Sequence, residues 1–222
     1  MSDGGLRLVR KFVNHSRRVG RLAREFGWLP GARYTNLRDV KWFDRLGFLD
    51  IQWSGYQYDR HLTAVKSTRP LLTVARDIER VRDLPKILDQ AHELAEYAEQ
   101  VIVVPKAPAL AQNLNELIPN RFLLGFSVRS KYGATPISPS YFRRPTHLLG
   151  GRPDIQRYLG SLMPVVSLDC NRFTLDAAYG DYFDGEIFRP HPVGGYERCI
   201  VDSLANINEL WQNYKWKCKT QR

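Results

Sequence analysis

The sequence predicts an α/β fold, and within that class a (β/α) barrel of the TIM type, possibly reduced. Short, uniformly apolar runs of the kind that form buried parallel strands alternate with helical stretches. The chain has 222 residues, somewhat fewer than the roughly 250 of a typical eight-unit barrel. An open doubly wound sheet has the same periodicity and stays an alternative.

Six apolar runs are predicted as strands: residues 47–53, 71–75, 101–104, 122–126, 147–149 and 165–168. Helical periodicity predicts four helices between and after them: residues 83–100, 109–117, 154–162 and 199–214. Residues 6–26 place apolar side chains at helical spacing and arginines mostly elsewhere, which predicts one basic amphipathic helix. We therefore divide the chain into a basic N-terminal extension, residues 1–46, and a (β/α)-barrel-like catalytic domain, residues 47–222.

Positive charge is concentrated at the two ends of the chain, whose net charge is +10. Residues 1–46 hold 11 basic and 4 acidic side chains, and residues 211–222 hold 4 and none. Between them the charges nearly balance. Lys and Arg on flanking segments suit phosphates, which predicts nucleic acid as the partner; basic ends that only keep the protein soluble are the alternative. The arginines of the predicted N-terminal helix would contact phosphates: Arg17, Arg18, Arg21 and Arg24.

Composition excludes several protein classes. The chain is 43% hydrophobic and 25% charged, as in globular proteins and unlike disordered ones. No apolar run approaches the roughly 20 residues that span a bilayer, and no signal peptide is visible, so we expect a cytoplasmic protein without a membrane partner. Three widely spaced cysteines without a CxxC pair predict reduced thiols: Cys170, Cys199 and Cys218. No GxGxxG or P-loop motif occurs, and we expect no cofactor.

Three aspartates follow or end predicted strands. Asp50 lies within GFLDIQW, Asp77 follows LLTVAR and Asp169 follows VVSL. Each taken alone is commonly a helix N-cap or the partner of a nearby arginine. In a parallel barrel all three would converge at the carboxyl ends of the strands, and converging carboxylates are costly unless chemistry needs them. We therefore predict that they form the site.

A glycine turn is the second candidate feature. In HLLGGRPDIQRYLG a strand ends at Gly150 and Gly151, and a helix begins near Pro153. Such glycines let the backbone approach a ligand, and the helix N-terminus offers free amides to a polar group. A tight turn without a ligand is the alternative.

A third segment contains Asp181, Asp184 and Glu186, with His191 nearby, and could hold a hard cation. It matches no EF-hand spacing and has no second histidine close by. A solvated loop is the preferred interpretation, and we expect no bound metal.

From HLLGGRP onward the sequence resembles the guanine transglycosylases, chiefly the archaeal-type tRNA enzymes. That family has a similar His-Leu-Phe-Gly-Ala-Gly-His-Pro turn, and the strand after it ends in a nucleophilic aspartate at the same interval as the 22 positions from His147 to Asp169. DIQWSGYQ resembles the family's Asp-Ser-Gly-Gly-Phe-Gln segment with two extra residues. VARDIE resembles a strand whose aspartate recognises the base. The resemblance covers residues 47–180 and is specific only from His147 to Tyr179.

The resemblance implies a role for each matched position. Asp169 would be a covalent nucleophile at C1′ of the sugar, and Asp50 would manage protons on the departing and incoming bases. Asp77 would accept hydrogen bonds from the amino and ring N–H edge of the base. The remaining positions would bind substrate, the glycine amides by receiving a carbonyl oxygen: Gln57, Gly150 and Gly151.

The chain departs from the tRNA enzymes in two respects. It lacks the closely spaced cysteines and histidine of their zinc site, and it is too short for their RNA-binding tail domains. It looks more like the compact phage relatives that insert 7-deazaguanine bases into DNA; for a phage-encoded chain the compartment would be the host cytoplasm. We therefore predict an enzyme that exchanges guanine, most readily in DNA, for a free 7-deazaguanine such as preQ0.

Three other functions stay open at this point. The same exchange could act on tRNA. A degenerate barrel could bind nucleic acid without catalysis, with the three aspartates as caps and ion-pair partners. The third alternative is a metal-dependent nuclease built on Asp181, Asp184 and His191.

Overall fold

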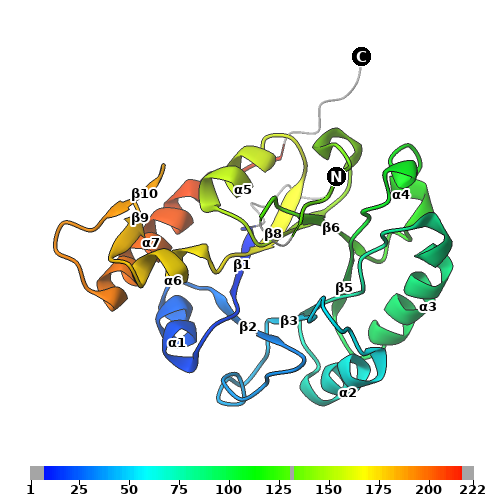
Figure 1. Ribbon diagram of the computed structural model, residues 1–222, viewed down its shortest axis with the longest axis horizontal. Helices are drawn as coiled ribbons and strands as arrows, with labels where there is room; N and C mark the ends of the chain where they lie inside the picture. The colour runs from blue at the N-terminus through cyan, green and yellow to red at the C-terminus, as the bar shows by residue number, and fades with distance from the viewer. Residues whose placement is uncertain (1–7, 131–132, 217–222) are drawn as a thin grey trace, which may run out of the picture.

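The computed structural model describes residues 8–130 and 133–216, and these form a closed barrel of eight parallel strands (Figure 1). The strands follow one another around the barrel in chain order: β1 (Arg10–Val13), β2 (Leu29–Arg33), β3 (Phe48–Asp50), β4 (Leu72–Val74), β5 (Gln100–Val103), β6 (Leu123–Ser127), β7 (Thr146–Leu149) and β8 (Val165–Asp169). The predicted TIM-barrel-like class is confirmed, and the barrel is complete rather than reduced.

Helices surround the barrel: α1 (Arg17–Glu25), α2 (Tyr58–Thr68), α3 (Leu84–Leu94), α4 (Leu114–Leu117), α5 (Pro153–Leu159), α6 (Arg172–Ala177) and α7 (Tyr196–Gln212). Short 3₁₀ turns and a hairpin complete the elements: η1 (Val81–Asp83), η2 (Pro108–Leu110), η3 (Pro139–Tyr141), β9 (Asp181–Phe183) and β10 (Phe188–Pro190). The barrel fits into a short chain because, among the described residues, the β2–β3 and β6–β7 connections contain no α-helix.

The inside of the barrel is packed with rings. Phe12 of β1 and Phe48 of β3 have ring centroids 5.9 Å apart, and both lie against the ring of His147 of β7. All three are buried. Gly47 makes this packing possible, because a Cβ atom there would lie 2.5 Å from Leu29 Cβ and 2.9 Å from Phe12 Cδ1. The barrel is therefore a filled core and not a channel.

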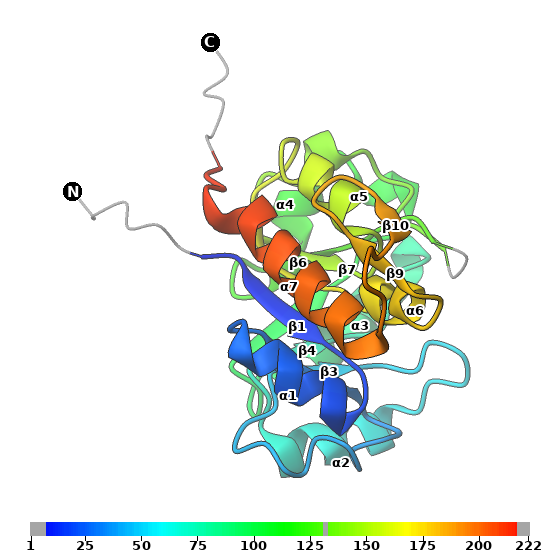
Figure 2. The ribbon, with the colours of Figure 1, turned by 90° about the vertical axis from the view of Figure 1, so that its left-hand side faces the viewer.

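The predicted N-terminal extension is wrong, because β1 and β2 are barrel strands. β1 pairs in parallel with both neighbours, with Phe12 opposite Leu29 of β2 and opposite Asp169 of β8. Figure 2 shows β1 and α1 beside the C-terminal helix α7. Residues 10–33 thus contain β1, α1 and β2, the first β/α unit of the barrel and the strand that follows it. They do not form an extension separate from the barrel, so residue 46 is not a domain boundary.

Residues 6–26, which the pattern predicts as one helix, contain the strand β1 and the helix α1 instead. Asn14 and His15 lie between these two elements. The Ser16 side chain then accepts a hydrogen bond from Val19 N–H at 3.5 Å, so α1 begins only at Arg17. Leu8, which the helical pattern puts on the apolar face, is 70% exposed. The strand has four residues, too few for its alternation to be distinguished from a helical repeat.

The other sequence predictions fare better. The six predicted strands correspond to β3 through β8, and the four predicted helices overlap α3, α4, α5 and α7. Cys170 and Cys199 are buried free thiols, whereas Cys218 lies outside the described residues. In the described part of the chain no helix has both the length and the apolar character needed to cross a bilayer.

Helix α7 ties the two ends of the barrel together. Trp28, just before β2, is buried, and its indole N–H donates to Asn208 Oδ1 of α7 at 2.9 Å. The Asn208 amide donates in turn to the carbonyl oxygen of Phe26 at 2.7 Å. Arg18 of α1 forms an ion pair with Glu197 of α7. The last helix therefore holds the first β/α unit in place.

Replacing Asn208 by Ala should lower the free energy of unfolding by about 2 kcal/mol, because a buried indole N–H and a backbone carbonyl lose their partners. Urea denaturation followed by circular dichroism measures the loss. Gln212→Ala, at an exposed position of the same helix, is the control and should cost less than about 0.5 kcal/mol. Equal stability of the two variants would contradict the role given to α7.

Candidate functional site

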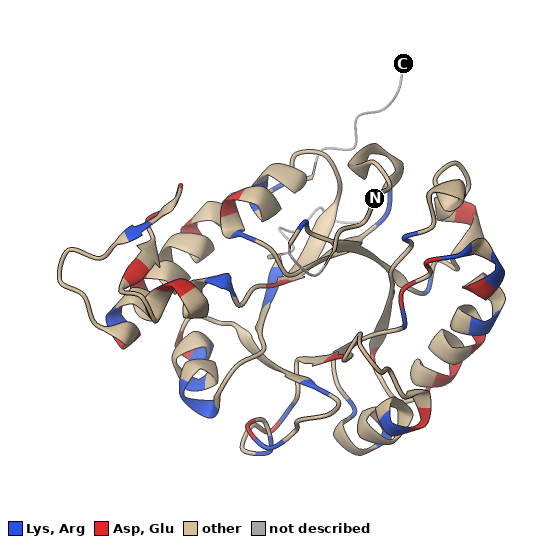
Figure 3. Cartoon of the chain, viewed as in Figure 1, with Lys and Arg blue, Asp and Glu red and all other residues tan. Residues whose placement is uncertain are grey.

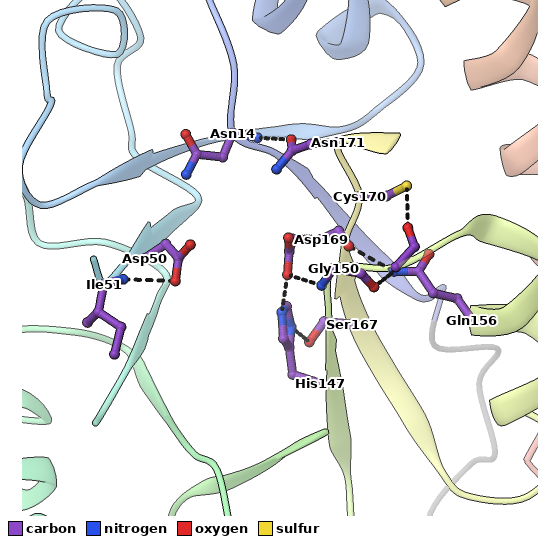
Figure 4. A network of polar contacts seen from close by, with 11 residues as sticks. Asn14, Asp50, Ile51, His147, Gly150, Gln156, Ser167, Asp169, Cys170 and Asn171 are labelled. Atoms are coloured by element: carbon purple, nitrogen blue, oxygen red, sulfur yellow. Dashed lines mark hydrogen bonds and ion pairs between the residues drawn. The ribbon is translucent and has the colours of Figure 1, made fainter. Parts of the chain in front are cut away.

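The carboxyl ends of the eight strands form the mouth of the barrel, and two of the predicted carboxylates face each other there. Asp50 is the last residue of β3, and Asp169 is the last residue of β8. Figure 4 shows their carboxyl groups on opposite sides of the mouth, with Asn14 nearby. Asp77 follows β4 and is close enough for its charge to affect Asp50. The strand ends thus bring the three aspartates together.

One oxygen of the Asp169 carboxylate is bound and the other is free. Oδ1 accepts the Gly150 N–H at 3.0 Å and lies 3.4 Å from Nε2 of His147. Within residues 8–130 and 133–216, no hydrogen bond or ion pair reaches Oδ2. The side chain is 9% exposed. Asp169 therefore presents a single, oriented oxygen to whatever enters the mouth.

His147 supports Asp169 from inside the barrel. Its Nδ1 lies 2.8 Å from the hydroxyl oxygen of Ser167, and the ring is fully buried. A carboxylate only accepts hydrogen bonds, so Nε2 carries the proton that points at Asp169, while Nδ1 is hydrogen-bonded to the Ser167 hydroxyl. Ser167 therefore orients the imidazole, and the imidazole orients the carboxylate.

The glycine turn after β7 also helps to hold the Asp169 carboxylate in place. Gly150 and Gly151 have φ angles of +61° and +96°, which favour glycine. Gln156 of α5 donates to the carbonyl oxygens of Gly150 at 2.7 Å and Asp169 at 2.8 Å, and so joins the turn to β8. The Gly150 amide is directed at Asp169 and is not free for a ligand carbonyl. The Gly151 amide has no partner in the described part of the chain.

Asp50 has an unusual protonation equilibrium. Its pKa is raised to about 7, chiefly by burial and secondly by the charge of Asp169. The Ile51 N–H, which donates to Oδ1 at 2.8 Å, and the charge of Arg33 oppose the shift only in part. Near neutral pH, Asp50 therefore exists in both protonated and ionised forms, as a group that gives and takes protons requires.

Asp77 is paired with a residue that the sequence did not single out. Lys106, which follows β5, places its Nζ 2.6 Å from Asp77 Oδ2, and both side chains are largely buried. Burial raises the pKa of Asp77, and the Lys106 ammonium opposes the rise. Lys106 also lies 6.0 Å from the ring centre of Trp53, whose side chain is exposed. One carboxylate oxygen of Asp77 is thus occupied.

Gln57 does not join the three aspartates. It precedes α2, its backbone N–H donates to the Tyr34 hydroxyl at 3.1 Å, and its exposed side chain accepts from Arg60 at 3.2 Å. The neighbouring Tyr56 contacts the buried His61 at 3.0 Å. The Gln57 side chain therefore lies at the surface, hydrogen-bonded to Arg60.

The four arginines predicted to contact nucleic acid all lie on α1, but one of them is ion-paired and the other three line a hollow. Arg18 is occupied by Glu197 of α7. The other three, together with Trp42 and Phe43, line a hollow on the outer surface. Figure 3 shows the basic character of α1. The three arginines in the hollow are Arg17, Arg21 and Arg24.

The segment proposed as a cation site is used for internal contacts. Asp184 forms an ion pair with Arg189 and accepts two backbone amides, and His191 Nε2 contacts Asp202 at 2.7 Å. Across the residues that the structure describes, no cluster of three or more His, Cys, Asp or Glu is arranged to hold a metal ion. Asp181 and Asp184 therefore do not form a site with His191.

Three polar residues of the mouth escaped the sequence analysis. Asn14 follows β1, and its backbone N–H donates to Asn171 Oδ1 at 2.8 Å. Asn171 follows β8 and Lys106 follows β5. Each stands just after a strand, the signal used for the aspartates. The sequence does not predict Asn14 at the mouth because residues 6–26 have helical periodicity, and it does not predict the other two because neither is a carboxylate or a glycine.

The fold and the mouth define an α/β-barrel protein with three carboxylates gathered at the carboxyl ends of its strands. The chain belongs to a family of unknown function (DUF6610), whose profile matches residues 23–212. No curated protein matches its sequence.

The pKa of Asp50 predicts how stability depends on pH. In the unfolded chain an aspartate has a pKa near 3.8, and in the fold Asp50 has a pKa of about 7. Between these values the folded state holds a proton that the unfolded state does not, so the contribution of Asp50 falls as pH rises and stays low above pH 7. Asn is neutral throughout and keeps the acceptor for Ile51 N–H.

Asp50→Asn should therefore be more stable than the wild type at pH 8, by about 1–2 kcal/mol because solvent reaches part of this side chain. The difference should shrink at pH 5, where Asp50 is itself neutral. Urea titrations at the two pH values measure it. A constant difference at both would contradict the raised pKa.

Proposed function

We propose that this protein exchanges guanine in nucleic acid, with DNA as the substrate, for a 7-deazaguanine base such as preQ0. The observation that supports the proposal most strongly is the pair of carboxyl groups facing each other in the mouth, one with a single free oxygen and one with a pKa of about 7. Base exchange at a sugar carbon needs this combination of a fixed nucleophile and a proton carrier. A cytoplasmic location suits such a substrate.

Asp169 carries the first half of the reaction. Its free Oδ2 attacks C1′ of the target nucleotide, a C1′–O bond forms, and the C1′–N9 bond breaks with its electron pair going to guanine. Oδ1 stays bound to the Gly150 amide and His147, which keeps the carboxylate plane fixed during the attack. The product is a glycosyl ester on the enzyme.

Asp50 carries the protons. In its neutral form it protonates the departing guanine and becomes a carboxylate. It then takes the N9 proton of the incoming 7-deazaguanine, whose nitrogen attacks C1′ and releases Asp169. A pKa of about 7 serves both steps, because neither the acid nor the base form is rare at neutral pH.

Asp77 binds the base in this proposal. Lys106 occupies one carboxylate oxygen, and the other accepts the amino or ring N–H of guanine. Burial raises the pKa of Asp77, and the Lys106 ammonium opposes this rise and so favours the ionised form that accepts hydrogen bonds. The target nucleotide must leave its stack to reach the mouth, as for other enzymes that act on a base.

The decisive variant is Asp169→Asn. It keeps an acceptor for the Gly150 amide but lacks the anionic oxygen, so exchange should fall at least about a thousandfold with little loss of stability. Intact-mass measurement of enzyme mixed with guanine-containing DNA should find a covalent adduct with the wild type and none with the variant. Release of guanine from the labelled strand measures the exchange.

Asp89→Asn, on an exposed position of α3, is the matched control and should retain the adduct. Single-stranded DNA, duplex DNA and tRNA are offered in parallel with labelled preQ0. Incorporation into tRNA alone would replace DNA as the substrate. Binding without base release in any arm would reduce the protein to a nucleic-acid-binding module.

A further inference from the structure

A second surface of the barrel has the character of a binding site. The hollow on the outside is bounded by α1 on one side and by the segment between β2 and β3 on the other, and its volume is about 410 Å³. Three of its lining residues, Arg17, Arg21 and Arg24, follow one another at helical spacing along α1. We call this hollow, with Trp42 and Phe43 on its other wall, the α1 groove.

The α1 groove is lined by three arginines and one carboxylate, Glu25, and ion pairs neutralise its cations only poorly. Arg24 comes no closer than 3.8 Å to Asp44, whose carboxylate is almost fully exposed. Arg17 lies over the ring of Trp42 at 4.4 Å instead of pairing with a carboxylate. Arg21 has no carboxylate partner in residues 8–130 and 133–216. Several arginines outside the groove pair with a carboxylate within 3.2 Å, among them Arg18, Arg38, Arg80, Arg152 and Arg172.

We propose that the α1 groove binds the sugar–phosphate backbone of the nucleic-acid substrate. The identity of that substrate rests on the proposed function, but the groove is separate from the mouth and makes a separate contribution. It supplies binding that does not depend on the base sequence, while the mouth handles one nucleotide.

The chemistry of the lining favours phosphodiesters. Guanidinium groups present a planar fork of donors that matches phosphate oxygens, and all three helical cations are arginines. Successive turns of a helix place them about 5.4 Å apart along one face, which suits a chain of regularly spaced charges. The exposed Trp42 ring fixes the Arg17 guanidinium and gives the groove an apolar wall for a sugar.

The position of the groove connects it to the mouth. Arg17, its first cation, stands three residues after Asn14, which lies beside Asp50 and Asp169. A strand held in the groove can therefore continue into the mouth. A membrane surface fits less well, because it is flat whereas the cations surround a hollow, and Trp42 is the only large apolar side chain of its lining that is strongly exposed.

The test is a binding measurement on the full-length protein with a fluorescein-labelled, guanine-free DNA 20-mer at several NaCl concentrations. The triple variant Arg17→Gln, Arg21→Gln, Arg24→Gln should bind at least tenfold more weakly and lower the slope of log K against log salt by about two units. Trp42→Ala should weaken binding less, and lower the slope less, because it only frees Arg17.

The matched control removes three cations on the α3 side of the barrel: Arg82→Gln, Lys86→Gln and Arg121→Gln. It should bind as the wild type does. Equal losses in the two triple variants, or an unchanged slope in the α1 variant, overturn the groove as a specific surface. Loss of binding to anionic phosphatidylserine vesicles, with DNA binding intact, would assign it to a membrane instead.

The result of the binding measurement does not depend on the exchange chemistry, because a guanine-free strand cannot react. If the α1 variant loses DNA binding but the wild type shows no base release from any guanine-containing substrate, the groove stands and the proposed function fails. If Asp169→Asn abolishes exchange but the α1 variant binds and reacts normally, the proposed function stands and the α1 groove fails as the binding surface.

Discussion

The pairing of β1 with β8 is the constraint on which the rest of the molecule depends. It closes the barrel, and its register sets Phe12 opposite Asp169. Asn14 then contacts Asn171 across the seam, so residues from both ends of the chain meet at the mouth. Without this closure the two aspartates would not face each other, because Asp50 lies opposite Arg33 of β2, Asp169 lies opposite Phe12 of β1, and β1 pairs with β2.

Around Asp169 the structure resolves a conflict between burial and charge. A buried carboxylate must be hydrogen-bonded, and here a backbone amide and a buried imidazole satisfy one oxygen. The second aspartate of the pair, Asp50, has its pKa raised by burial first and by the charge of Asp169 second. Two chemically identical side chains thus have different hydrogen-bonding environments, and ionising Asp50 lowers the stability of the fold.

The sequence was informative where a strand lies within a run of apolar residues. The runs that became β3 to β8 are uniformly apolar, and the aspartates at their ends could be placed from strand order alone. The strand Arg10–Val13 could not be recognised, because two of its four residues are charged and its buried side depends on two neighbours distant in sequence. The pairing of Lys106 with Asp77 depends on the register between β4 and β5, which the sequence alone does not show.

The helix that is missing between β2 and β3 has a consequence beyond economy of length. In a regular barrel a helix there would cover the flank of α1. Here an irregular segment descends instead, and it comes so close that a methyl group on Gly20 of α1 would lie 2.9 Å from the Phe43 ring. Phe43 covers the side of α1 at Gly20, and the hollow lies beside this contact. The absence of a helix between β2 and β3 thus leaves a recess where a regular barrel would have a covered side.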